Sequence, residues 1–342
     1  MSILRFFLFP FSLIYACVIF IRNTLFNLQI FHSKSHRVKL IVIGNLSTGG
    51  TGKSPLTLYL AELLNKNMNL SILSRGYGRK TKGFRWVEFN SDAHEVGDEP
   101  LMFKTTLGEH IPISVCENRN NGVENIQSDF PNTDVILLDD AFQHRKIKAG
   151  FSILLTTFDN PFFQDFLLPV GSLREFKSGA SRSDLILVTK CPMQISIKQK
   201  KEFQNNLLKY GKPVFFAKVK YGELINFTFE IPAIKKCIVV TGIANPSGII
   251  DYLAQSFSLE PMVFSDHHSY TKPEIDAIHQ KFDTFATDGV AIVTTCKDYM
   301  RLKKNTEEWG LINYPWYILP ISVEIDDEEK FNKLITDYVR KN

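Results

Sequence analysis

The sequence predicts an α/β protein built on a doubly wound, mostly parallel sheet. Three observations support this prediction. Short apolar runs alternate with segments of helical periodicity along the chain. A glycine-rich loop, 42-VIGNLSTGGTGKSP-55, lies between one such run and one such segment. The 342 residues are 44% hydrophobic and 22% charged, which is ordinary composition for a globular protein that can bury a full core.

The first half of the chain contains most of the predicted strands. They are expected at residues 38–43, 70–73, 113–115, 134–138, 152–156 and 184–188. Helices are expected at 54–66 and at 99–106. The second half repeats the alternation, with strands at 214–219, 237–241 and 291–294 and helices at 247–255, 272–286 and 328–339.

A domain boundary is expected near residues 200–215, because the charged stretch 198-KQKKEF-203 separates the two series of elements. We therefore expect an N-terminal hydrophobic helix over residues 1–36, a phosphate-binding core over 37–210 and a smaller C-terminal α/β subdomain over 211–342.

The apolar run at residues 6–21, FFLFPFSLIYACVIFI, differs from the rest of the chain. It is slightly shorter than the roughly 20 residues of a perpendicular membrane span. A signal peptide is disfavoured because no small-x-small cleavage site follows, and a lipoprotein signal because bulky Tyr15 precedes Cys17 by two residues. A buried core helix stays open as an alternative. We favour a membrane-associated helix that dips into one leaflet or just spans the bilayer. The basic residues expected to face anionic head groups are Lys34, Arg37 and Lys39.

Charge and cysteine content narrow the possible partners. The net charge of +4 suits an anionic partner but is far below that of a dedicated nucleic-acid binder, so no nucleic acid is expected. The five cysteines contain no C-x-x-C pair, which indicates neither a disulfide framework nor a zinc site and fits a reducing cytoplasm.

The glycine-rich loop has a predicted strand before it and a predicted helix after it, as a nucleotide-binding loop requires. Its backbone N–H groups can turn toward phosphate oxygens, and the helix N-terminus faces them. Lys53 would reach the β- and γ-phosphates, and the Ser54 hydroxyl would bind Mg²⁺. Ser47 replaces the first glycine of the generic G-x-x-x-x-G-K-[ST] pattern, but the glycines nearest the phosphates remain. The residues expected to hold the nucleotide are Gly49, Gly50, Thr51, Gly52, Lys53 and Ser54.

The stretch 135-VILLDDAFQHR-145 has the pattern of a Walker B strand, in which a carboxylate at the strand end holds Mg²⁺ opposite the loop. Asp139 and Asp140 are the expected magnesium-site carboxylates, although Asp-Asp at a strand end is also a common turn. Two other nucleotide-binding classes fit less well. Partition-type ATPases carry a lysine where this chain has Thr48, and GTPases need an aspartate where 189-TKCP-192 ends in proline.

Two further stretches carry candidate acid–base groups. In 97-GDEPLM-102, Asp98 and Glu99 could cap a helix start or could orient an acceptor hydroxyl. In 264-FSDHHSYT-271, neighbouring His267 and His268 could form a carboxylate–imidazole pair, although a plain polar turn explains the string equally well. The histidine spacing does not support a helical metal site.

Eight stretches of the sequence together resemble the tetraacyldisaccharide 4'-kinase family, the lipid A 4'-kinases of Gram-negative bacteria. They occur in the family's order, and LLDDAFQHR, PxGxLRE and the late D-H-H are more specific than the phosphate loop. That family's loop also lacks the first consensus glycine, which accounts for Ser47. The matching stretches are 44-GNLSTGGTGKSP-55, 74-SRGYGR-79, 97-GDEP-100, 137-LLDDAFQHR-145, 169-PVGSLRE-175, 241-TGIANPSG-248, 265-SDHH-268 and 294-TTCKD-298.

The resemblance implies a P-loop kinase core, a smaller C-terminal α/β subdomain and a membrane-associated N-terminal helix. It implies an ATP- and Mg²⁺-dependent kinase at the cytoplasmic face of the inner membrane. Such a kinase would phosphorylate the 4'-hydroxyl of an acylated glucosamine disaccharide 1-phosphate in lipid A synthesis. An ATP-driven switch or chaperone on the membrane, without a glycolipid substrate, is the alternative. The specific DDAFQHR and SLRE strings count against it.

The resemblance also assigns residues. The family's aspartate–histidine base maps onto Asp98 and His267, the latter favoured over His268 because it directly follows Asp266. Lys53 and Arg174 would contact phosphate or the charge developing on it. One position departs from the family pattern, since Cys296 stands where an acidic residue is frequent. The family's role for this segment is therefore assigned to Lys297 and Asp298 with less support. A basic loop is expected either to meet the sugar 1-phosphate and lipid head groups or to be simply solvated; its residues are Arg75, Arg79, Lys80 and Lys82.

Overall fold

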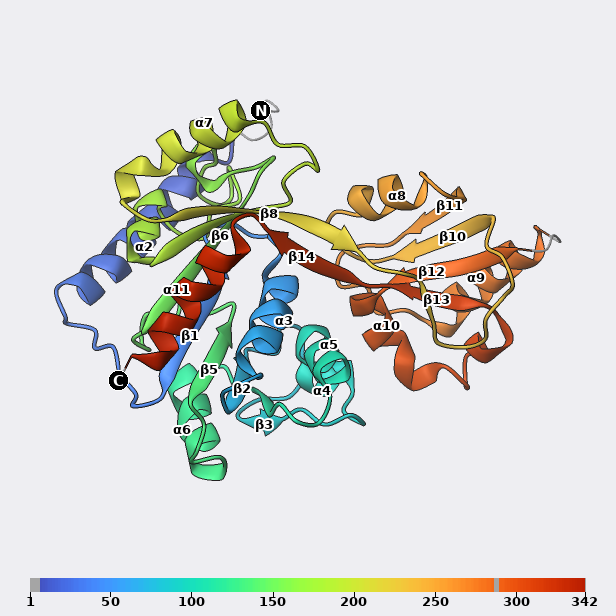
Figure 1. Cartoon of the computed structure of the whole chain (residues 1–342), viewed down its shortest axis with the longest axis horizontal. Helices are drawn as coiled ribbons and strands as arrows, with labels where there is room; N and C mark the ends of the chain where they lie inside the picture. The colour runs from blue at the N-terminus through green and yellow to red at the C-terminus, as the bar shows by residue number, and fades with distance from the viewer. Residues whose placement is uncertain (1–6, 286–288, 342) are drawn as a thin grey trace.

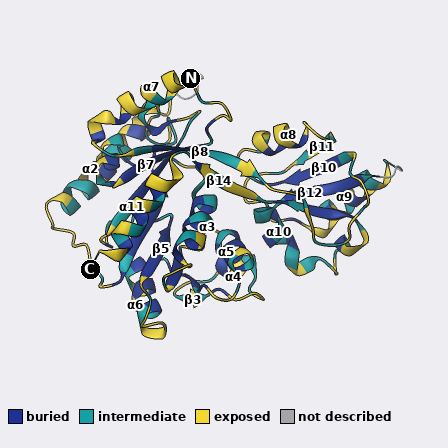
Figure 2. Ribbon diagram, viewed as in Figure 1, coloured by how far each residue is buried: buried dark blue, intermediate teal, exposed yellow. Residues whose placement is uncertain are grey.

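The computed structural model describes residues 7–285 and 289–341, and it places two sheets side by side (Figure 1). The larger sheet has the spatial order β14 (Ile321–Ile325), β8 (Val214–Tyr221), β7 (Leu185–Thr189), β6 (Phe151–Thr157), β1 (Lys39–Asn45), β5 (Val135–Asp139), β2 (Leu70–Ser74), β4 (Ile113–Val115) and β3 (Arg85–Trp86). The smaller sheet has the order β11 (Ser258–Val263), β10 (Lys236–Thr241), β12 (Val290–Thr295), β13 (Trp316–Leu319) and β9 (Ile225–Asn226). The central strands of both sheets are buried, dark blue in Figure 2, whereas β8 and the edge strands β14 and β11 are partly exposed.

The larger sheet is doubly wound, as the sequence predicts. Neighbouring strands from β8 to β4 run parallel, and the antiparallel pairs β14–β8 and β3–β4 lie at its two edges. Successive residues of β1 alternate between two cores, with Ile41 in one and Val42 in the other, because strand side chains point to opposite faces. The predicted fold class is confirmed.

Helices cover both faces of the larger sheet. Buried side chains of α3 (Lys53–Leu64), α5 (Asp98–Leu107) and α11 (Glu328–Arg340) belong to one core. Buried side chains of α6 (Arg119–Asp129) and α7 (Ile197–Leu207) belong to the other. The smaller sheet carries α8 (Ser247–Leu253), α9 (Lys272–Asp283) and α10 (Cys296–Leu302), and α10 lies against α5 of the larger unit. The expected end of the 272–286 helix, Ala286, falls outside the described residues.

The sheets divide the chain differently from the expected boundary at residue 210. The stretch 198–203 lies inside α7, where the Ser196–Gln199 capping box starts a helix. β8 belongs to the larger sheet, and β14 returns to pair with it over five residue pairs. The amphipathic α11 then buries Phe331, Ile335 and Val339 in a core of the larger sheet. The smaller unit is therefore inserted between two strands of the larger one (Figure 1).

The N-terminal helix α2 (Phe9–Asn27) attaches to the larger unit through polar side chains. Tyr15 donates to the Arg174 carbonyl at 2.9 Å, and Asn23 donates to Glu175 Oε1 at 3.1 Å. The helix is long and apolar enough to cross a membrane by length and composition, with mean hydropathy 1.6. Its apolar window is only 11% buried, which excludes the buried core helix. Large exposed side chains on it include Phe9, Phe11, Leu13, Ile14, Val18, Phe20 and Ile21.

Candidate active site

The glycine-rich loop lies at the carboxyl end of β1, where α3 begins directly after Gly52. Ser47 pairs antiparallel with Leu173, and Thr48 N–H donates to the Ser172 carbonyl at 2.8 Å. The position that lacks the consensus glycine thus takes part in a backbone pair with the loop that carries Arg174. This pairing explains why a glycine is not needed at Ser47.

Arg174 and Lys53 both lie beside Asp140. The Arg174 guanidinium binds both Asp140 oxygens, at 2.9 and 3.1 Å, and also contacts the Asn45 side chain. Lys53 Nζ lies 3.7 Å from Asp140 Oδ1. Burial would raise the pKa of Asp140, but the Lys53 charge and the Arg174 hydrogen bonds lower it to about 2. The site therefore keeps an ionised carboxylate between two cations, and phosphate oxygens could replace it as their partner.

Asp139 has a different environment from Asp140, although the two are adjacent. Its side chain is buried, and Oδ2 accepts from Ser74 at 3.0 Å. Burial raises the pKa of Asp139, and the neighbouring charges of Glu99 and Asp140 raise it further. Among the described residues Oδ1 has no hydrogen-bond partner. A cation beside Oδ1 would satisfy that atom, so the donor set fits Mg²⁺.

Protein ligands alone do not make a closed metal cage here. Across residues 7–285 and 289–341, no three His, Cys, Asp or Glu side chains gather at one point as a metal site would require. Magnesium commonly takes one or two protein carboxylates and completes its shell with water and substrate phosphates. Ser54 and the Asp139–Asp140 pair are consistent with such an open site.

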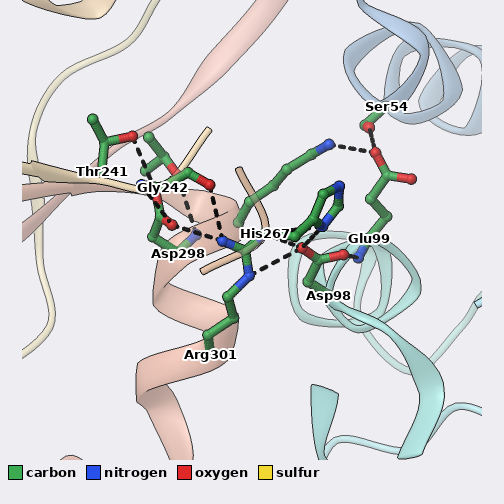
Figure 3. Close-up of polar contacts among 10 residues, drawn as sticks. Ser54, Asp98, Glu99, Thr241, Gly242, His267, Asp298 and Arg301 are labelled. Carbon is green, nitrogen blue, oxygen red and sulfur yellow. Dashed lines mark hydrogen bonds and ion pairs between the residues drawn. The ribbon is translucent and has the colours of Figure 1, made fainter. Parts of the chain in front are cut away.

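The GDEP stretch forms the first turn of α5. Gly97 has φ +94°, and a Cβ there would lie 3.1 Å from the Gly76 Cα, so the loop after β2 can approach only a glycine. Glu99 accepts a hydrogen bond from the Ser54 hydroxyl at 2.7 Å (Figure 3). It also forms an ion pair with Lys297 of α10. Glu99 thus connects the phosphate loop to the smaller unit.

Asp98 meets His267 across the two units (Figure 3). The His267 Nδ1 lies 3.1 Å from Asp98 Oδ2, and Asp98 Oδ1 accepts the Glu99 N–H at 2.8 Å. The Asp98 side chain is 6% exposed, whereas that of His267 is 36% exposed. The hydrogen bond to Asp98 raises the pKa of His267. His267 also has φ +57°, a sparsely populated conformation for a non-glycine residue.

His268 points elsewhere. Its Nε2 contacts the Glu274 carboxylate at 3.0 Å, and its ring stacks on Phe264 with 4.8 Å between centroids. Glu274 belongs to the capping box that starts α9. The structure therefore brings His267, and not His268, to Asp98.

Several basic residues from the sequence analysis are engaged by the protein itself. The Arg79 side chain is 2% exposed and pairs with Glu117, so it shapes the loop after β2 and is not presented to a ligand. Lys34 forms an ion pair with Glu124. Lys39 lies 5.9 Å from the centroid of the Tyr338 ring. Arg75 remains exposed.

The sequence analysis assigned Lys297 only weakly and missed one of the closest contacts. Lys297 pairs with Glu99. Arg301 was not singled out, yet its guanidinium binds Asp98 from α10. Arg301 also pairs with buried Asp298 at 2.9 Å. Their i,i+3 spacing on one helix is the one sequence signal that could have pointed to Arg301.

Comparison with known proteins gives consistent matches over the whole chain. A family model described as "Tetraacyldisaccharide-1-P 4'-kinase" matches residues 4–340. Proteins named "Tetraacyldisaccharide 4'-kinase" are 38% identical in Flavobacterium johnsoniae and 40% identical in Flavobacterium psychrophilum. Each alignment covers 100% of this chain and 99% of the relative. A crystal structure of LpxK from Aquifex aeolicus in complex with ATP has a TM-score of 0.76 at 30% identity, covering 98% of this chain and 100% of that one.

Proposed function

This chain belongs to the tetraacyldisaccharide-1-P 4'-kinase family, and on that premise we propose a reaction and roles for its residues. It is a tetraacyldisaccharide 4'-kinase of lipid A biosynthesis. The reaction transfers the γ-phosphoryl group of ATP to the 4'-hydroxyl of an acylated glucosamine disaccharide 1-phosphate. One observation carries the assignment of roles. Asp98 and Glu99 are adjacent at one helix start, and Glu99 contacts the phosphate loop while Asp98 contacts His267.

The nucleotide binds the loop at the carboxyl end of β1. Backbone N–H groups of Gly49, Gly50, Thr51 and Gly52 surround the phosphates, and Lys53 contacts the β- and γ-phosphates. Arg174 leaves Asp140 to contact the transferring group. Mg²⁺, held by Ser54, Asp139 and Asp140, supplies charge neutralisation on the phosphates when it is bound.

Asp98 orients the acceptor hydroxyl. Its Oδ2 is already bound by His267 and by Arg301, whereas Oδ1 accepts the Glu99 N–H and can accept a second donor. The 4'-oxygen attacks the γ-phosphorus as the bond to the β,γ-bridging oxygen breaks. The hydroxyl proton passes to Asp98 Oδ1, and ADP leaves. A weakly basic carboxylate suffices because proton transfer is late in a loose phosphoryl-transfer transition state.

The exposed apolar face of α2 supports a placement at the membrane. Its exposed apolar side chains would enter the inner membrane from the cytoplasmic face, while its polar contacts hold the core at the surface. The acyl chains of the substrate then stay in the bilayer as its sugar reaches the site. This location keeps a lipid substrate and a water-soluble nucleotide within reach of one centre.

The test is transfer of label from [γ-³²P]ATP to the disaccharide 1-phosphate in mixed micelles with Mg²⁺. We expect the wild-type chain to form the bisphosphate. Asp98→Asn should lower kcat by roughly 10²-fold, because the amide cannot accept the proton, while ATP affinity changes by less than about threefold. Asp92→Asn is the matched control, because Asp92 caps the neighbouring helix α4 (Ala93–Val96) without touching Asp98.

Two results would count against the proposed reaction, and a third against the role of Asp98. Folded wild-type protein that makes no bisphosphate at any ATP or Mg²⁺ concentration would exclude the reaction. ATP hydrolysis that responds to a protein partner and ignores the glycolipid would favour a switch or chaperone instead. An Asp98→Asn enzyme at full rate would leave the reaction standing but remove Asp98 from its proposed role.

A further inference from the structure

Arg301 of α10 extends from the smaller unit to Asp98, the candidate base. Its Nε donates to Asp98 Oδ2 at 3.1 Å, and its Nη2 contacts the same oxygen (Figure 3). Its Nη1 donates to Asp298 Oδ1 at 2.9 Å and to the Gly242 carbonyl at 3.1 Å. The Arg301 side chain is 9% exposed, so this planar fork is held inside the protein.

Arg301 is held by a buried group, the Asp298 carboxylate, which has further hydrogen-bond partners. Asp298 is fully buried and accepts from Thr295 at 2.7 Å and from the Gly242 N–H at 3.1 Å. Gly242 is closely packed, because a Cβ there would lie 3.0 Å from the Ser265 carbonyl oxygen. The Gly242 carbonyl also accepts a hydrogen bond from the His267 N–H, at 3.1 Å. One framework therefore fixes both Arg301 and the turn that carries His267.

We propose that Arg301 is a positioning residue for phosphoryl transfer, which holds Asp98 ionised and turned with Oδ1 toward the acceptor hydroxyl. The inference rests on the proposed function of Asp98. Arg301 and His267 occupy Oδ2 from the smaller unit, so the carboxylate cannot rotate without breaking both contacts. Arg301 itself touches neither nucleotide nor acceptor in this scheme.

The charges around Asp98 support this role. Burial would raise the pKa of Asp98, but the His267 hydrogen bond and the Arg301 charge hold it well below its usual range, with Lys297 adding to the effect. Glu99 on the same helix is the opposing negative charge. Loss of Arg301 would leave a buried carboxylate with fewer compensating charges, so the pKa of Asp98 would rise.

His267 faces a similar set of groups. Asp98 and the adjacent Asp266 raise the pKa of His267, and Arg301 opposes them. Loss of the Arg301 charge would therefore raise the pKa of both members of the pair. The acid limb of the pH–rate profile would then move to higher pH, which a purely structural role would not cause.

The experiment compares two substitutions by pH–rate profile in the micelle assay. For Arg301→Gln we expect kcat at neutral pH to fall by roughly 10²-fold, because misplaced catalytic groups cost about that much. We expect the loss to shrink as pH rises and the KM for ATP to change less than about threefold. Arg301→Lys keeps the positive charge but loses the planar guanidinium and its several N–H donors. The acid limb of its pH–rate profile should therefore stay near the wild-type position, and its kcat should be intermediate.

Lys304→Gln is the matched control. Lys304 also joins the two units, through an ion pair with Asp92, but it does not touch Asp98. This variant should keep the wild-type profile. ATP affinity and thermal unfolding of each variant establish that it is folded. If Arg301→Gln does not fold, the test rests on Arg301→Lys, and a wild-type kcat for that variant overturns the proposal.

Three outcomes would overturn the role of Arg301. The first is an Arg301→Gln enzyme with the wild-type kcat. The second is an Arg301→Gln enzyme whose kcat is reduced by the same factor at all pH values. The third is an Arg301→Lys enzyme with a kcat as low, and an acid limb as far displaced, as those of Arg301→Gln. Each of these requires an active wild-type enzyme. A wild-type chain that forms no bisphosphate would instead contradict the proposed function, so the two failures are distinguishable.

Discussion

The two sheets contribute to the candidate site in different ways. The larger sheet supplies its groups from loops at the carboxyl ends of neighbouring parallel strands, where Lys53 follows β1 and Asp139 ends β5. The smaller sheet supplies His267, Lys297 and Arg301 from a turn and a helix that meet α5. In the proposed reaction, the groups that bind nucleotide come from local motifs, whereas the groups that act on the acceptor depend on how the two units fit together.

Lys53→Met would test the larger sheet's half of this comparison and should have the largest effect. Lys53 is the cation expected on the β- and γ-phosphates, so kcat/KM should fall by about 10³-fold, or about 4 kcal/mol of transition-state stabilisation. Steady-state kinetics over a range of ATP concentrations would measure it. Lys34→Met, which removes an exposed ion pair with Glu124, should change kcat/KM little. A Lys53→Met enzyme with more than a tenth of wild-type activity would contradict this role.

His267 and His268 separate the chemistry of the smaller unit from its packing. His267→Asn should lower kcat by roughly 30-fold, or about 2 kcal/mol, because it removes a hydrogen bond that orients Asp98. His268→Asn should leave kcat within about twofold and lower the thermal midpoint instead, since His268 packs on Phe264 and binds Glu274. Equal losses of kcat in the two variants would show that the contact with Asp98 has no special role.

The sequence predicts the fold better than it predicts the boundary between the two units. Apolar periodicity locates the long buried strands, because burial on both faces of a parallel sheet requires continuous apolar runs. Short edge strands such as β3 and β9 carry little of that signal. The return of β14 to β8 is a pairing between segments about 100 residues apart, which no local pattern encodes.

The same limit applies to the site. Asp98 and Glu99 stand out together because they start a helix, but neighbouring residues on a helix point about 100° apart. They therefore meet different partners, His267 for one and Ser54 for the other. Arg301 carries no motif of its own. Its importance appears only when α10 is placed against α5.

Acid should weaken the smaller sheet through a buried histidine. His279 of α9 is buried, accepts the Trp316 indole N–H at Nε2 at 3.2 Å, and stacks on Tyr314. Burial lowers the pKa of His279 to about 4 from an ordinary value of 6.5. The unfolded chain therefore takes up a proton first, so this contribution to stability is complete above pH 6.5 and is lost as pH falls toward 4. Between pH 7 and pH 5.5 the free energy of unfolding should drop by about 1 kcal/mol.

Amide hydrogen exchange can assign that loss to one unit. Protection of β10 and β12 should fall with pH over this range, because His279 packs in the core of the smaller sheet. Burial also lowers the pKa of His144, near β5, to about 4, so β1 and β5 can lose protection independently. His279→Gln should remove the loss in β10 and β12 but not any loss in β1 and β5, since its amide oxygen can accept from Trp316 without titrating. An acid loss in β1 and β5 that also disappears in His279→Gln would mean that the two units unfold as one. The contact of α5 with α10 would then couple their stability as well as their chemistry.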